Sequence, residues 1–195
     1  SITVYNRSNN GDVAPKRTIS GGNTRLNGPV GITLTTVNNE IFVANYWYNF
    51  ITVYSRMADG DTPPLRTITG TTTGLNAPWG IALDMVNDEI VVSNVWNNSI
   101  TVYDSTADGD VAPKRTISGP STGLIDLWGI ALDTVNEEIF AENVWNDSIT
   151  VYPRTADGNI PPLRTISGAS TGVCGPAGIA LDIENEEIFV GNLID

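Results

Sequence analysis

Short runs rich in β-branched and aromatic residues alternate with polar turn residues along the whole chain. Between positions 80 and 118, for example, apolar runs at 80–84, 89–93, 99–103 and 114–118 are separated by segments such as Asn-Asp and Asp-Gly-Asp. Runs of this length bounded by Gly, Pro, Asn and Asp are typical of β-strands joined by turns. No window shows apolar residues at helical spacing over ten residues. The pattern predicts four short antiparallel strands per unit and almost no helix.

The same unit recurs every 49 residues. The motif Ile-Thr-Val-Tyr ends at positions 5, 54, 103 and 152. Four further columns keep this spacing, namely Gly31, Gly80, Gly129 and Gly178; Glu40, Glu89, Glu138 and Glu187; Asn45, Asn94, Asn143 and Asn192; and Arg17, Arg66, Arg115 and Arg164. Four strands in roughly 40 to 50 residues make one propeller blade, whereas a solenoid coil, the alternative, usually needs only about 20 to 30. We predict one all-β domain over 1–195, with repeats 1–49, 50–98, 99–147 and 148–195.

Three sequence elements of this unit resemble a known family. They are Pro78-Trp79-Gly80-Ile81-Ala82-Leu83-Asp84, the strand end Phe42-Val43-Ala44-Asn45, and the Ile-Thr-Val-Tyr strand that follows. Together they resemble NHL and YVTN-type propeller repeats over essentially the whole chain. The resemblance implies four-stranded blades around a central axis. It implies little about activity, because such families contain lactonase-like enzymes as well as binding scaffolds.

The register of the repeat places half a blade at each end of the chain. With strands lettered A to D outward from the axis, residues 1–5 and 15–20 are strands C and D, and residues 178–182 and 187–191 are strands A and B. An open strand edge invites pairing with another strand. Pairing within one chain predicts a four-bladed ring, and reciprocal pairing between two chains predicts an eight-bladed homodimer. We favour the homodimer, because neighbouring blades at about 90° crowd the axis and repeats that resemble these usually close with six or more blades.

Composition excludes several partners and chemistries. The chain has 10 basic and 22 acidic residues, a net charge of −12, which disfavours nucleic acid and anionic membranes. No apolar run approaches the roughly 20 residues of a membrane span. There is no His, and Cys174 is the single Cys, so the commonest general base and an intrachain disulfide are both excluded. We expect no cofactor, and the sequence gives no indication of a cellular compartment.

One face of the predicted propeller concentrates aromatic residues. The D–A and B–C connections emerge on this face, the upper face, whose only charged residues are Arg25, Asp126, Glu142, Asp147 and Asp195. Aromatic rings beside amide side chains suit neutral, hydrogen-bonding ligands such as glycans or peptides. The candidate ligand-binding residues are Trp79 and Trp128 before strand A, Trp47, Trp96 and Trp145 in the B–C loops, and Asn45, Asn94, Asn143 and Asn192. The alternative is structural: the loop Trp column seals the wedges between blades, and the Asn column ties down turns.

Metal binding and catalysis have weaker support. The Asp108-Gly109-Asp110 loop suits turn formation better than a Ca²⁺ site, because no further oxygen ligands follow at the needed spacing. The acidic columns are expected to bond to turn amides or to the Arg column. The resemblance implies that a metal-dependent lactonase holds its ion at the axis with Glu, Asn and Asp, but here that column is four neutral Asn. We predict a non-catalytic scaffold that presents a binding surface; the alternative is a metal-dependent, lactonase-like hydrolase.

Overall fold

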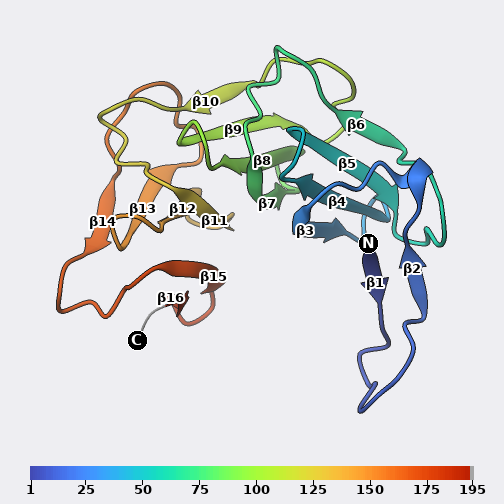
Figure 1. Ribbon diagram of the computed structural model, residues 1–195. Coiled ribbons are helices and arrows are strands. Elements are labelled where there is room, and N and C mark those ends of the chain that lie inside the picture. The colour runs from blue at the N-terminus through green and yellow to red at the C-terminus, as the bar shows by residue number, and fades with distance from the viewer. Residues whose placement is uncertain (194–195) are drawn as a thin grey trace.

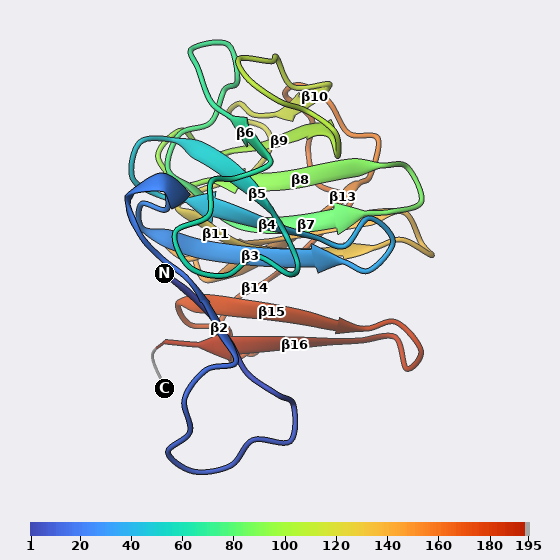
Figure 2. The same cartoon turned by 90° about the vertical axis from the view of Figure 1, so that its right-hand side faces the viewer.

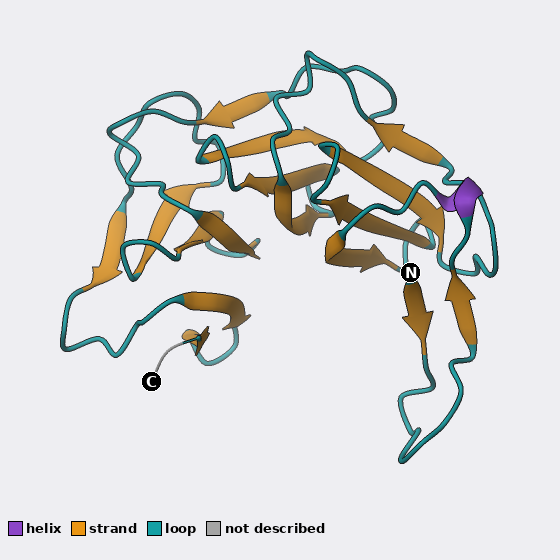
Figure 3. Cartoon of the chain, in the orientation of Figure 1, coloured by secondary structure: helices purple, strands orange, loops and turns teal. Residues whose placement is uncertain are grey.

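The computed structural model describes residues 1–193, which are almost entirely β-strands and loops (Figure 3). Three complete antiparallel sheets, blades 1 to 3, are each formed by four consecutive strands. Blade 1 contains β3 (Pro29–Thr35), β4 (Glu40–Asn45), β5 (Phe50–Ser55) and β6 (Arg66–Ile68). Blade 2 contains β7 (Pro78–Asp84), β8 (Glu89–Asn94), β9 (Ser99–Asp104) and β10 (Arg115–Ile117). Blade 3 contains β11 (Leu127–Asp133), β12 (Glu138–Asn143), β13 (Ser148–Pro153) and β14 (Arg164–Ser167).

Helix is almost absent, as the hydrophobic pattern predicts. Among residues 1–193 the one helical segment is a single 3-10 turn, η1 (Gly22–Thr24). None of the described helical structure is long and apolar enough to cross a membrane.

The described chain begins and finishes with a two-stranded sheet. β1 (Ile2–Val4) pairs with β2 (Arg17–Ile19), and β15 (Pro176–Asp182) pairs with β16 (Glu187–Asn192). By their repeat positions, β1 and β2 form the outer half of a blade, the N-terminal half-blade, and β15 and β16 form the inner half, the C-terminal half-blade. This confirms the predicted register of the ends. In the single chain the two half-blades remain separate sheets, at the two ends of an open arc (Figure 1).

The inner strands β3, β7, β11 and β15 contact one another in that order. Figure 2 shows them from the side, with β15 and β16 below the long strands of the complete blades. The close approach of the inner strands explains the glycines Gly31 and Gly80 at this position in blades 1 and 2. A Cβ atom on Gly80 would lie 2.7 Å from the Trp128 carbonyl oxygen and 2.9 Å from Ser93 Oγ. Both distances are too short for a side chain, so neighbouring inner strands can touch only because this position has none.

The hydrophobic core is divided among the blade interfaces. Alternate residues of a strand face opposite sides of its sheet: Phe42 and Ala44 pack against Ile81 of blade 2, whereas Ile41 and Val43 pack toward the N-terminal half-blade. Blades 2 and 3 repeat this packing, as do blade 3 and the C-terminal half-blade. Each blade is therefore stabilised by its two neighbours, which is the expected arrangement of a repeat protein.

Candidate functional site

The upper face carries a connected group of aromatic rings, which we call the aromatic cluster; its members are Tyr46, Trp47, Trp79, Trp96 and Trp128. Trp79 and Trp128 stack, with centroids 4.5 Å apart and planes 27° from parallel. Tyr46 lies edge-on to Trp47, Trp79 and Trp96 at centroid distances of 4.7, 5.6 and 5.6 Å. The Trp96 indole also donates a hydrogen bond to the Tyr46 hydroxyl at 2.9 Å. The cluster therefore joins all three complete blades across the upper face.

The positions of Trp79 and Trp128 follow from an irregularity in the sheet. In blade 2 the pairing of β7 with β8 shifts register between Pro78 and Ile81, and in blade 3 the pairing of β11 with β12 shifts between Leu127 and Ile130. A residue in such a bulge leaves the regular ladder, so its side chain can be redirected. Each Trp sits inside its bulge and remains partly accessible at the inner end of its blade.

The loop tryptophans differ in their surroundings. Trp47, Trp96 and Trp145 are 53%, 59% and 78% exposed, so more than half of each side chain is accessible at the surface. Tyr46 of blade 1 contacts Trp96 of blade 2. In blade 2 the residue equivalent to Tyr46 is Val95, which has no aromatic ring to contact Trp145 of blade 3. Among the described residues, Trp145 accordingly has no ring partner. The structure brings together four of the five predicted Trp and leaves Trp145 apart.

The Asn column lies beneath the loops. Asn45, Asn94 and Asn143 have no accessible surface. The Asn45 carboxamide oxygen accepts from the Asn27 backbone N–H at 2.9 Å, and its Nδ2 donates to Thr52 Oγ1 at 3.0 Å. Equivalent bonds hold Asn94 and Asn143, and Asn192 accepts from the Cys174 N–H at 2.9 Å. Because these amides are already bonded within the chain, they support the loops, and the candidate contact surface reduces to the aromatic cluster.

Glu142 is a functional candidate that the sequence reasoning did not select. Its side chain is fully buried beside Gly129, next to Trp128, and neither carboxylate oxygen makes a hydrogen bond. Burial raises the pKa of Glu142 to about 7, and the nearby backbone N–H groups of Gly178 and Gly129 offset this only in part. The sequence does contain one indication that Glu142 is special. The equivalent positions in the other three repeats are the small residues Ala44, Ser93 and Gly191. A long acid among small residues marks this blade as different.

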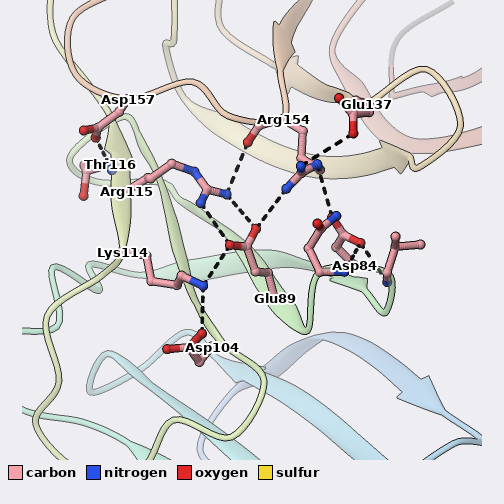
Figure 4. A network of polar contacts seen from close by, with 11 residues as sticks. Asp84, Glu89, Asp104, Lys114, Arg115, Thr116, Glu137, Arg154 and Asp157 are labelled. Carbon is pink, nitrogen blue, oxygen red and sulfur yellow. Dashed lines mark hydrogen bonds and ion pairs between the residues drawn. The ribbon is translucent and has the colours of Figure 1, made fainter.

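The acidic and basic columns meet away from the upper face. Arg115 makes a bidentate ion pair with Glu89, with N–O distances of 2.9 and 2.7 Å, and Lys114 and Arg154 also approach the carboxylate (Figure 4). Hydrogen bonds from Arg115 and Lys114 lower the pKa of Glu89 to about 2. The same pair recurs as Arg66 with Glu40 and Arg164 with Glu138. The sequence left turn amides and the Arg column open as partners of the Glu column, and in all three complete blades the partner is the Arg column.

The turn carboxylates are also used within the chain. Asp84 Oδ1 accepts from the backbone N–H groups of Val86 and Asn87 at 3.0 and 3.1 Å. Within residues 1–193 no three His, Cys, Asp or Glu side chains gather in a way that could hold a metal ion. The bonded Asn oxygens and the solitary Glu142 do not form the oxygen-rich set that a divalent cation needs. The residues present at the axis therefore do not fit the ion of a lactonase-like site.

Fold and surface define a class of protein, all-β repeat proteins whose four-stranded sheets pack as propeller blades. Within this class, residues 75–103 match the family model of the NHL repeat, which confirms the resemblance for blade 2. Among solved structures, Kuenenia stuttgartiensis hydrazine synthase is similar, with a TM-score of 0.64 and 16% identity over 90% of this chain and 46% of that chain. This likeness shows the fold alone, and our chain spans about half the length of that one. A search of curated proteins found no match.

Proposed function

We propose that this protein is a non-catalytic repeat scaffold whose upper face binds a neutral glycan or peptide through the aromatic cluster. The single observation that supports this most strongly is the set of rings joining three blades on a face with few charges. A contiguous exposed patch of apolar rings, unlike single scattered rings, is typical of a surface that binds a ligand or a partner.

The chemistry of the cluster favours a neutral ligand. Indole and phenol rings offer flat apolar faces that stack on the carbon face of a sugar or on an apolar peptide side chain. The Trp47 and Trp96 indoles lie more than half exposed, so their faces are accessible. A charged ligand would find few partners, since Arg25 is the one basic residue among the loops of this face.

The proposal includes a closed ring. The N-terminal half-blade would complete the C-terminal half-blade, either within one chain, giving four blades, or between two chains, giving eight. The eight-bladed homodimer is supported by the open arc of the single chain, in which the two half-blades are separate sheets (Figure 1). Such a dimer would present two aromatic clusters on one rigid body.

Binding to an array of neutral oligosaccharides and short peptides tests the function. We expect the chain to bind a subset of the array, and the double variant Trp79→Ala, Trp128→Ala to lose that binding. Trp145→Ala is the matched control, because Trp145 lies on the same face but outside the cluster. Circular dichroism would check that each variant folds. Absence of any ligand on the array, or full binding by the double variant, would overturn the proposal.

A further inference from the structure

The repeat provides an internal template for contacts that the two half-blades do not make in the single chain. Each complete blade contains one ion pair between the Glu that begins its second strand and the Arg that begins its fourth strand. In the half-blades these columns continue as Glu187 on β16 and Arg17 on β2. Glu187 is exposed, and the Arg17 guanidinium donates to the Arg56 carbonyl at 2.9 Å. Arg115 makes the equivalent carbonyl contact while also holding Glu89, so Arg17 is already placed to receive a carboxylate.

A second contact follows the same rule. The hydroxyls of Tyr54, Tyr103 and Tyr152 each donate to a threonine carbonyl thirty residues earlier, at 2.5 Å. These three side chains are buried, whereas Tyr5, the fourth of the column, is 50% exposed. The carbonyl that continues the series belongs to Thr171, beside the C-terminal half-blade. The Tyr5 hydroxyl therefore lacks a partner in its own half-blade, and the other half-blade offers the matching acceptor.

The strand pairing inside a complete blade also predicts how the two half-blades would pair. Phe140 of β12 lies opposite Val151 of β13. One repeat later, the residue equivalent to Phe140 is Phe189 on β16, and the residue equivalent to Val151 is Val4 on β1. An antiparallel pairing of β16 with β1 in this register would join the two half-blades into one four-stranded sheet and satisfy both open edges.

The apolar faces beside these edges are left uncovered in the single chain. Ile32 on β3 is 54% exposed, whereas Ile81, its equivalent in blade 2, is 8% exposed because it packs against Phe42. Phe189, the equivalent of Phe42, is 56% exposed on the other half-blade. A groove of about 500 Å³ runs along Ile32 between β1 and β3, where the inner strands of a completed blade would lie. Phe189 and Ile32 would thus cover each other.

We propose that a second copy of this chain occupies each edge, so that β16 of one copy pairs with β1 of the other and Glu187 of one copy binds Arg17 of the other. This inference rests on the ring closure proposed above and assigns its contacts. A twofold axis makes both joints identical, which satisfies all four open edges with one kind of partner. Within a single chain the half-blades are separate sheets at opposite ends of the arc (Figure 1).

Sedimentation equilibrium on the 195-residue chain tests the proposal. We expect a mass of twice 20.9 kDa. Glu187→Arg and Arg17→Glu should each place like charges at both joints and raise the dimer dissociation constant roughly tenfold or more. Glu184→Arg is the matched control, since it makes the same charge change on an exposed turn residue that has no counterpart in the template.

A mixture of the two variants tests the assigned ion pair most sharply. In a mixed pair, the two substituted positions meet at one joint with their charges exchanged, and the original Glu187 and Arg17 meet at the other, so both joints are attractive. We expect the one-to-one mixture of Glu187→Arg and Arg17→Glu to regain the doubled mass. A monomeric parent chain would overturn the proposal and indicate closure within one chain or by other segments. Variants that keep the dimer dissociation constant of the parent, or a mixture whose dissociation constant stays as high as that of the single variants, would overturn the assigned contacts. Ligand binding by the aromatic cluster is measured separately, so the two proposals can fail independently.

Discussion

Glu142 makes a sharp prediction about stability and pH. Burial raises its pKa to about 7 in the folded chain, against 4.5 for an ordinary Glu, and the backbone N–H groups of Gly178 and Gly129 offset this only in part. Because the pKa of this carboxyl is higher in the folded chain than in the unfolded chain, losing its proton destabilises the fold. The unfolding free energy therefore has its full value below about pH 4.5 and decreases as the pH rises through 7. A shift of this size corresponds to about 3 kcal/mol in total, of which about 2 kcal/mol falls between roughly pH 5.5 and 8.5.

Urea unfolding at pH 5.5 and 8.5 measures this loss. We expect the parent chain to lose about 2 kcal/mol of unfolding free energy at the higher pH, equivalent to about 4 to 8 °C in melting temperature for a chain of this size. Glu142→Gln keeps the shape but removes the charge, so its stability should be nearly the same at both values. Glu184→Gln, on an exposed turn, is the control and should behave like the parent. Equal pH sensitivity in Glu142→Gln and the parent would refute the burial argument.

Three further changes test the packing and the absence of a metal role. Gly80→Ala should cost about 1 to 3 kcal/mol in thermal unfolding, because the new Cβ meets the Trp128 carbonyl; Gly22→Ala, which meets nothing within 4 Å, should be close to neutral. Tyr103→Phe leaves the buried Thr73 carbonyl without its donor and should cost about 1 to 3 kcal/mol in urea unfolding, with an unchanged m-value. Millimolar Ca²⁺ or EDTA should leave the melting temperature unchanged, and a rise with Ca²⁺ would favour a metal-dependent function.

The repeat made most of the fold predictable. Because Ile-Thr-Val-Tyr recurs with turn residues at fixed spacing, the strands, their order and the half-blades at both ends could be assigned from local pattern alone. The pairing of Glu89 with Arg115 was one of the two partners that the repeated columns predicted for the Glu column. These features depend on residues within one blade, where sequence spacing fixes spatial proximity.

The site was less predictable because it depends on contacts between blades. Tyr46 joins the cluster only because its ring reaches Trp96 of the next blade, a contact that spacing within a repeat does not reveal. The Asn column stood out in the sequence as a surface candidate, yet Asn45 turns inward to bond the Asn27 N–H. The sequence placed Glu142 on the upper face but did not reveal its burial, which depends on the close approach of neighbouring inner strands.

Amide hydrogen exchange at β16 tests ring closure most directly. Strand β12 holds the same repeat position inside a complete blade, where it pairs on both sides with β11 and β13. If β1 of another copy completes the sheet, the amides of Glu187–Asn192 should exchange as slowly as those of Glu138–Asn143 at concentrations where the dimer forms. Fast exchange along the outer edge of β16 under those conditions, with β12 still protected, would contradict the closed ring.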